Sequence, residues 1–280
     1  MKKFIAAFDG LSFSESSMNY AIYLAGQAKA HLVGVFLEDF TRHGYSVSQL
    51  AQYEGAAFDQ HLQELKDADS DERKKSISLF EQACSDKGIN YSVHRDRNVA
   101  IQELLHESIY ADLLIIDVAE TLTRFQEEPP SRFIKDLLGE VQCPVLVVPS
   151  EYNKVEKVII LYDGEPSSVF ALRNFSYLFD FMQVPVEILT VKDRNESMHL
   201  PDGRMIREFA KRHYPDASYI VLKGHSEDEI IRYLHLEKKN AIVVLGAYKR
   251  GKLSRLFRPS MADHLMQKLK LPLFIAHNRS

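Results

Sequence analysis

The sequence predicts an α/β fold made of two tandem, doubly wound domains, each with a five-stranded, mainly parallel sheet. Three observations support this prediction. Apolar runs alternate with helical patterns along the chain, the whole series of elements occurs twice, and several apolar runs are continuous aliphatic segments. Such uninterrupted runs are typical of strands that are buried on both faces of a parallel sheet.

The elements follow one another in the order that such a fold requires. Helical patterns, for example over residues 16–29 and 100–110, separate the apolar runs. The expected strands of the first copy cover 4–9, 31–37, 90–95, 112–117 and 144–149, and those of the second cover 157–163, 186–192, 217–223, 241–246 and 272–277. We expect the last strand of each copy to be a sheet edge, and the two edges to pair with each other so that the halves pack as a pseudo-dimer.

The repeat defines the predicted domains. KKFIAAFDG at the amino terminus returns as EKVIILYDG, which aligns Asp9 with Asp163, and Pro130 aligns in the same way with Pro259. These alignments place the domains at residues 1–152 and 153–280. The first copy is longer by about 25 residues, which lie after the second strand.

Bulk composition excludes several classes of protein. The chain has 280 residues, of which 45% are hydrophobic and 26% charged, as in globular proteins, and its net charge of −4 argues against general nucleic-acid binding. No run approaches the roughly 20 apolar residues that span a bilayer, so we expect no membrane partner. The two cysteines, Cys84 and Cys143, fit neither a disulfide framework nor a metal site, and we expect a cytoplasmic location.

The extra segment of the first copy, about residues 39–65, mixes aromatic with small residues. It follows the second strand, on the side where a doubly wound sheet binds ligands. It could cover the first cleft, contact a partner, or form an amphipathic helix over local core, and its helical periodicity favours the last interpretation.

Four features, each in order and most of them in both halves, resemble the universal stress protein family in its tandem two-domain form. An Asp ends the first strand of each half (Asp9 and Asp163), a long helix follows, a turn after the fourth strand contains the run 253–256, LSRL, and the last strand carries CPVLVV, residues 143–148. The resemblance implies Rossmann-like domains and a cytoplasmic stress-response regulator or sensor.

ATP-binding members of that family resemble one another in a turn of the form Gly-x2-Gly-x9-Gly-Ser/Thr, whose glycines let backbone amides approach phosphates. The second half has Gly246 at the first position and Ser260 at the last, with Lys249 and Pro259 in place of the other two glycines. The first half has Asp117, Glu120, Pro130 and Ser131.

The second-half turn is basic, and the resemblance implies that it holds the phosphates of ATP, AMP or another phosphorylated ligand. The implied cofactor-binding residues are Tyr162, Asp163, Val191, Gly246, Lys249, Arg250 and Ser260. Asp163 would accept hydrogen bonds from a base or ribose, Val191 would line the base pocket, and cationic side chains and the helix N-terminus would bind phosphate. The alternative is a solvated basic loop in which Ser260 is a helix N-cap and Asp163 only forms a turn with Gly164.

The first-half turn holds four acidic residues and one basic residue between Asp117 and Pro130. Like charges oppose a triphosphate there, so this nucleotide site is degenerate, or altered for another ligand. We favour its interpretation as a solvated polar loop, with Ser131 as the N-cap of the next helix.

The predicted function is therefore ligand-dependent regulation through the second domain. The alternative is a scaffold that binds no nucleotide and acts through protein contacts, and a weak ATPase ranks lowest. No catalytic residue or metal ligand is predicted. We expect an unidentified protein partner, and a homodimer stays open.

Overall fold

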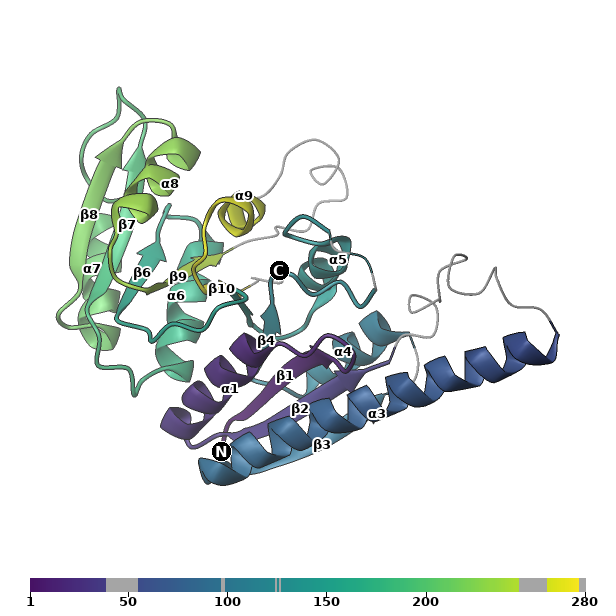
Figure 1. Ribbon diagram of the computed structural model, residues 1–280. Coiled ribbons are helices and arrows are strands. Elements are labelled where there is room, and N and C mark those ends of the chain that lie inside the picture. The colour runs from purple at the N-terminus through teal and green to yellow at the C-terminus, as the bar shows by residue number, and fades with distance from the viewer. Residues whose placement is uncertain (39–54, 97–98, 124, 126, 247–260, 277–280) are drawn as a thin grey trace.

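The computed structural model describes residues 1–38, 55–96, 99–123, 125, 127–246 and 261–276. Its strands form one ten-stranded sheet in the order β3-β2-β1-β4-β5-β10-β9-β6-β7-β8. Figure 1 shows this sheet running through the centre of the molecule, with helices on both sides.

The elements alternate between strand and helix as the sequence predicts. The first half consists of β1 (Lys3–Asp9), α1 (Glu15–Ala28), β2 (His31–Leu37), α3 (Ala56–Asp86), β3 (Tyr91–Asp96), α4 (Ala100–Ile109), β4 (Leu113–Asp117), α5 (Arg132–Glu140) and β5 (Val145–Val148). The second half consists of β6 (Lys157–Leu161), α6 (Pro166–Leu178), β7 (Val186–Lys192), α7 (Gly203–His213), β8 (Ser218–Lys223), α8 (Ser226–Leu236), β9 (Ala241–Gly246), α9 (Met261–Lys268) and β10 (Leu273–Ala276).

Each half is a doubly wound parallel sheet, and the two sheets join at their last strands. All neighbouring strands within a half pair in parallel, whereas β5 and β10 pair antiparallel, with Leu146 opposite Phe274. This pairing removes the exposed edges that the two sheets would otherwise have. The predicted fold class and the pseudo-dimeric packing are confirmed, while the boundary between residues 152 and 153 stays a prediction.

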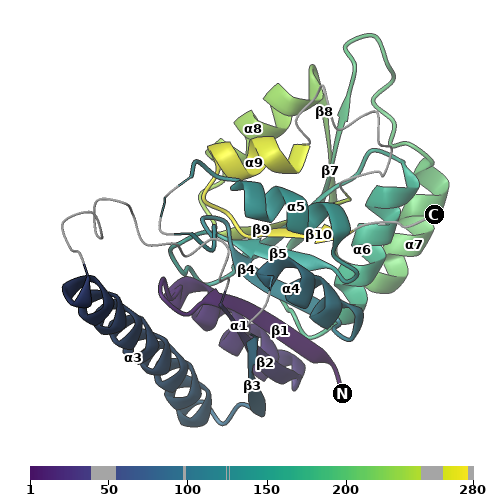
Figure 2. The same cartoon turned by 90° about the vertical axis from the view of Figure 1, so that its right-hand side faces the viewer.

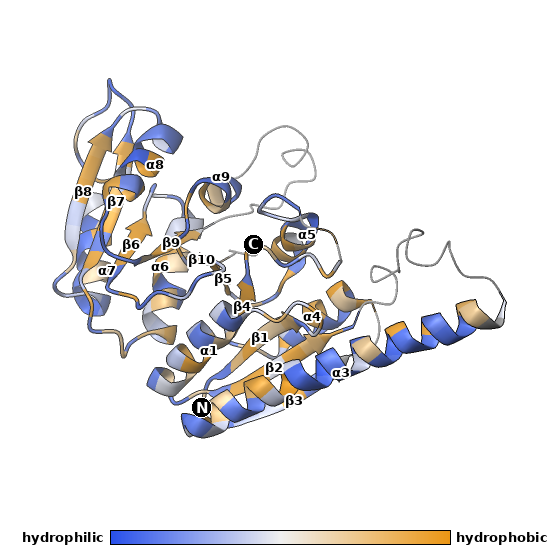
Figure 3. Cartoon of the chain, in the orientation of Figure 1, coloured by the Kyte–Doolittle hydropathy of each residue, from blue (hydrophilic) through white to orange (hydrophobic). Residues whose placement is uncertain are grey.

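Two apolar cores cover the two faces of the sheet, because successive side chains of a strand point to opposite sides. One core contains Phe4, Phe8 and side chains of α1, α3, α6 and α7, and the other contains Ile5, Ala7 and side chains of α4, α5, α8 and α9. Figure 2 shows the resulting three layers, and Figure 3 shows the apolar strands enclosed by helices with hydrophilic outer faces. Each core runs through both halves, so the halves share their interior.

The extra length of the first copy lies largely in α3. This helix has 31 residues, whereas α7, which follows the corresponding strand of the second half, has 11. The carboxyl-terminal part of α3 packs on the first half through Ile77, Phe80 and Cys84. Figure 1 shows its amino-terminal part projecting beyond the sheet.

For the described part of residues 39–65, the predicted helix is confirmed as the start of α3, but the prediction that it covers local core is wrong. Residues 39–54 lie outside the described residues, and none of residues 57–65 is buried. The apolar side chains of this stretch continue the face of α3 that is buried further along the helix. The sheet does not extend far enough to bury them.

Candidate functional site

The carboxyl ends of the parallel strands form one candidate site in each half. In the strand order, β1 lies between β2 and β4, and β6 lies between β7 and β9. The connections leave β1 and β4, and likewise β6 and β9, in opposite directions, which creates the crevice where such sheets bind ligands. Asp9 and Asp117 end β1 and β4, Gly246 ends β9, and Asp163 follows β6.

Tyr162 lies in the interior of the second half rather than on the surface of its cleft. Its side chain is 3% exposed, its hydroxyl donates a hydrogen bond to the Pro201 carbonyl at 3.0 Å, and its own carbonyl accepts one from Thr190 Oγ1 at 2.8 Å. Burial raises the pKa of Tyr162, and the nearby carboxylates add to this. The hydroxyl therefore positions the loop that precedes α7.

Asp163 is exposed at the mouth of the second cleft. Its Oδ1 accepts a hydrogen bond from the backbone N–H of Glu165 at 2.9 Å, which forms the predicted Asp-Gly turn. Gly164 has a φ of 86°, and a Cβ there would lie 2.5 Å from Pro201 Cβ, so only glycine fits. Asp163 thus stabilises the turn, and its carboxylate stays in contact with solvent.

Val191 and Gly246 lie on the strands that flank β6. Val191 is half-buried near the carboxyl end of β7. A Cβ at Gly246 would lie 2.3 Å from the carbonyl oxygen of Ser167, in the first turn of α6. Gly246 is therefore required for the packing of α6 against β9, whether or not a ligand approaches it. Lys249, Arg250 and Ser260 lie outside the described residues.

In the first half, the Asp117 carboxylate takes the place that corresponds to Gly246. Its Oδ2 accepts a hydrogen bond from Ser14 Oγ at 2.6 Å, and its Oδ1 accepts from Ser150 Oγ at 3.0 Å and from the Ala119 N–H at 2.8 Å. Ser14 is also the N-cap of α1 and accepts from the Ser17 N–H at 3.2 Å. Asp117 thus joins β4, the start of α1 and the segment after β5.

Glu120, at the position of the second glycine of the family turn, is a buried carboxyl group. It is 7% exposed, and its oxygens accept hydrogen bonds from the backbone N–H groups of Leu122 at 3.0 Å and Asp9 at 3.3 Å. Burial, together with the charges of Asp9 and Asp117, raises the pKa of Glu120 to about 8. The favoured interpretation of this turn as a solvated polar loop is therefore wrong for Glu120, whereas Phe125, Glu127 and Glu128 of the same turn are exposed.

Two residues that follow Glu120 are buried as well. Leu122 is fully buried with a φ of 52°, and Thr121 is 7% exposed. Ser131 caps α5 as predicted: its Oγ accepts from the Ile134 N–H at 3.2 Å and donates to the Glu120 carbonyl at 2.5 Å. These contacts hold the buried residues 120–122 against the amino terminus of α5.

The helix α3 packs against the turn that follows β1, and its Phe80 joins a cluster of aromatic side chains. A Cβ at Gly10 would lie 2.8 Å from Arg73 Cγ, and Ser76 Oγ donates a hydrogen bond to the Gly10 carbonyl at 2.8 Å. The ring centroids of Phe8 and Phe80 lie 5.5 Å apart. In the second half, Pro201 lies against the corresponding turn.

A cavity of about 870 Å³ nevertheless remains at the carboxyl edge of β1 and β4. Five of its lining residues carry carboxyl groups: Asp9, Glu15, Asp117, Glu120 and Glu127. Within the described part of the chain, no group of His, Cys, Asp and Glu residues is arranged to hold a metal ion. The helices of the described residues include none that could span a membrane.

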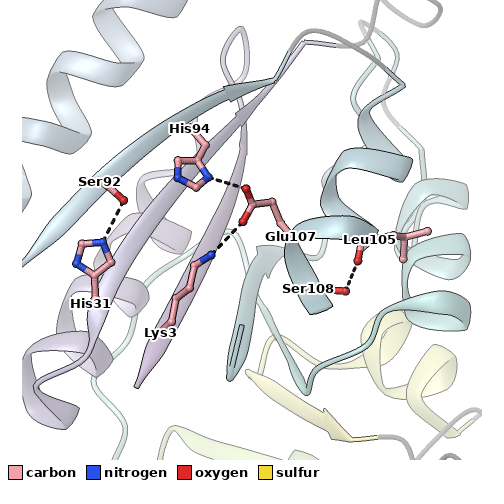
Figure 4. A network of polar contacts seen from close by, with 7 residues as sticks. All are labelled: Lys3, His31, Ser92, His94, Leu105, Glu107 and Ser108. Atoms are coloured by element: carbon pink, nitrogen blue, oxygen red, sulfur yellow. Dashed lines mark hydrogen bonds and ion pairs between the residues drawn. The ribbon is translucent and has the colours of Figure 1, made fainter. Parts of the chain in front are cut away.

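The opposite, amino-terminal edge of the sheet carries ion pairs that connect strands with helices. Figure 4 shows Glu107 between two partners: Lys3 Nζ lies 3.2 Å from its Oε2, and His94 Nδ1 lies 2.6 Å from its Oε1. Burial alone would raise the pKa of Glu107, but the hydrogen bonds from His94 and Lys3 outweigh this and lower it. Lys157, the counterpart of Lys3 in the repeat, pairs with Glu187 at 2.8 Å and Glu237 at 2.5 Å.

Similarity to known proteins covers nearly the whole chain. The crystal structure of a universal stress protein from Archaeoglobus fulgidus DSM 4304 covers 98% of this chain and 98% of its own, with a TM-score of 0.72 and 15% identity. This chain has the tandem fold of the universal stress proteins. The universal stress protein Slr1230 of Synechocystis sp. (strain ATCC 27184 / PCC 6803 / Kazusa) is 20% identical over 292 residues, which cover 98% of this chain and 99% of that protein.

The predicted resemblance to the tandem universal stress proteins is thereby confirmed. A functionally unknown protein from Pseudomonas aeruginosa PAO1 shares the fold as well, covering 99% of this chain and 92% of its own with a TM-score of 0.59 and 12% identity. No family model matches the chain. The universal stress protein fold thus extends through both halves, although sequence identity is low.

Proposed function

We propose that this protein is a ligand-dependent regulator of the stress response that binds a nucleotide or another phosphorylated ligand in its second half. The observation that carries the proposal is the exposed carboxylate of Asp163 at the carboxyl end of β6. Its counterpart in the first half, Asp9, is 1% exposed, and its backbone N–H donates to Glu120. Of the two aspartates, that of the second half is the exposed one.

In the proposed binding mode, the base and ribose of the ligand bind on one side of the second cleft and its phosphates bind on the other. Asp163 accepts hydrogen bonds from a base or ribose, and Val191 provides apolar contact for the base. Gly246 leads into residues 247–260, whose five basic side chains supply charge for phosphate. Ligand binding would then order this turn and change a surface that a protein partner contacts.

Calorimetric titration of the full chain with ATP, ADP and AMP tests the proposal. We expect one binding site per chain, and a loss of affinity of about tenfold in Asp163→Ala, since a hydrogen bond to a charged acceptor contributes about 1.5–3 kcal/mol. Asp216→Ala is the matched control, because Asp216 is an equally exposed carboxylate that precedes β8 at the opposite edge of the sheet. Absence of binding at millimolar nucleotide would overturn the proposal.

A second candidate is a scaffold that acts through protein contacts, and the shape of α3 favours it. None of residues 57–72 is buried, and Phe58, Leu62 and Leu65 lie half-exposed at helical spacing on the continuation of its packed face. Sedimentation velocity of the wild type and of Leu62→Ser/Leu65→Ser tests whether this face joins chains. If both proteins sediment as monomers and the wild type binds nucleotide, the scaffold is excluded as a self-associating one and the ligand-dependent regulator remains.

A further inference from the structure

The strand β8 ends the second half of the sheet with an open edge. It is last in the strand order, and its neighbour there is β7 (Figure 1). On the β7 side, the Gly224 N–H donates to the Lys192 carbonyl at 2.9 Å. Backbone groups of successive residues in a strand point to alternate sides, so those of Tyr219, Val221 and Lys223 point away from β7. No described residue forms a backbone hydrogen bond with this side of β8.

The residues of β8 leave this edge able to pair with a further strand. Charged residues, proline and bulges are the usual means by which proteins block an edge. The strand has six residues without a proline, its one charged residue is Lys223 at the end, and residues 219–222 are half-buried. The edges of β5 and β10 are closed because these two strands pair with each other, whereas that of β8 stays available.

A line of basic side chains from α7 lies beside this edge. The Arg207 guanidinium lies over the Tyr219 ring, with 4.9 Å between its central carbon and the ring centroid. Arg204 and Lys211 lie three residues before and four residues after Arg207, so the three side chains share one face of the helix. All three are exposed, and within the described part of the chain none of them forms an ion pair.

A strand added to β8 would present alternate side chains to two different surfaces. On the face where Tyr219 and Val221 pack, it would meet the basic side chains of α7. On the other face it would meet the apolar surroundings of Ile220 and Leu222. We propose that the edge of β8 binds an extended segment of a partner protein, which adds as a strand and places acidic side chains against the basic face of α7.

A second copy of this chain fits the edge less well than an acidic segment does. Two β8 strands would pair about a two-fold axis perpendicular to the sheet, which places both α7 helices on the same face. The helix α7 carries four Lys and Arg residues and one acidic residue, Glu208. Their like charges would repel one another across such a pair, so the charge of the edge favours a different chain.

Fluorescence anisotropy of a labelled peptide of alternating glutamate and threonine tests the proposal, with the full chain as the receptor. Threonine favours a strand without adding charge, and a peptide of about eight residues spans the whole of β8. We expect saturable binding that weakens as the salt concentration rises. A peptide of alternating lysine and threonine should not bind, because its charges repel those of α7.

Two variants separate the contribution of charge from that of strand pairing. Arg204→Glu/Lys211→Glu should weaken binding about tenfold or more, because two attractive contacts become repulsive. Arg132→Glu/Lys135→Glu makes the same change of charge at exposed residues of α5 in the first half, and should bind as the wild type does. Val221→Pro removes an N–H that points away from β7, and should weaken binding about fivefold or more. An N-methylated form of the acidic peptide, which keeps its charge but cannot pair, should not bind.

Four results would overturn the proposal. The first is no saturable binding at millimolar peptide, and the second is undiminished binding of the N-methylated peptide, which indicates charge attraction alone. The third is equally tight binding of an oligothymidylate of the same charge, which indicates a general anion surface. The fourth is a wild-type dimer in sedimentation velocity that Val221→Pro dissociates, which assigns the edge to a second copy. The nucleotide titration reports on the second cleft, so each proposal stands or fails without the other.

Discussion

The two clefts of this molecule occupy equivalent positions but differ in what fills them. In the first half, the carboxyl groups of Asp117 and Glu120 line a cavity at the carboxyl edge of the strands, and α3 packs against the turn after β1. In the second half, Gly246 stands at the position of Asp117, and Asp163 is exposed. A duplicated fold has thus retained its sheet while changing the charge and access of each cleft separately, which allows each to take a different ligand.

The largest expected effect comes from removing the aromatic side chain that α3 contributes to the first half. Phe80 is fully buried, so Phe80→Ala should lower the free energy of unfolding by about 3–5 kcal/mol. Its neighbour Leu79 is 46% exposed, and Leu79→Ala should cost less than about 1 kcal/mol. Urea denaturation of both variants checks this. Equal losses would show that α3 is not packed on the first half as described.

The ion pairs at the amino-terminal edge should also distinguish the halves. Lys157 is 8% exposed and pairs with two carboxylates, so Lys157→Met leaves both without their cation and should cost about 3–5 kcal/mol. Lys3→Met should cost about 1 kcal/mol, because the Lys3 side chain is 30% exposed and Glu107 keeps His94 as a partner. Denaturant unfolding at neutral pH measures both values, and a larger loss for Lys3→Met would contradict the comparison.

A substitution at Gly246 should destabilise the second half without any ligand present. The added Cβ of Gly246→Ala would lie 2.3 Å from the Ser167 carbonyl oxygen, so α6 must shift, at a cost of about 1–3 kcal/mol. Gly203→Ala is the control, since its nearest neighbour would lie 3.7 Å away and alanine favours a helix. Thermal unfolding of the two variants in the absence of nucleotide should separate them, and matching midpoints would remove the packing explanation for Gly246.

The pH dependence of the free energy of unfolding should show the raised pKa of Glu120 in the first half. Its folded-state pKa of about 8 lies above the usual value near 4.3, so the folded state binds the extra proton between these values. The resulting stability is present at acidic pH and is lost as the pH rises toward 8, by about 2 kcal/mol between pH 6 and pH 8. Unfolding of the wild type and Glu120→Gln across this range should give a flatter curve for the variant, and parallel curves would exclude the raised pKa.

Much of the fold was predictable, because the strands are short, continuous apolar runs and the repeat locates them twice. The pairing of β5 with β10 also followed from the two unpaired edges. The contacts of Asp117 and Glu120 were not predictable in the same way, because their partners Ser14, Ser150 and Asp9 lie in other elements. Periodicity alone likewise cannot show where the sheet ends beneath α3.

For the candidate site, the sequence identified the ends of the strands but not the states of their side chains. It placed Asp9 and Asp163 at equivalent positions, yet one is buried and the other exposed. Asp9 is buried, and its backbone N–H donates to Glu120, a residue from another segment of the chain. The alignment of Glu120 with the second glycine of the family turn was the available signal for its unusual position.

We infer that the two clefts have diverged and that phosphorylated ligands bind only in the second. A crystal structure of the full chain grown with AMP is the decisive test. We predict electron density for AMP beside Asp163, Val191 and Gly246, with none in the first-half cavity beneath Glu120. Density for AMP in the first-half cavity, or in neither cleft at saturating concentration, would contradict the claim.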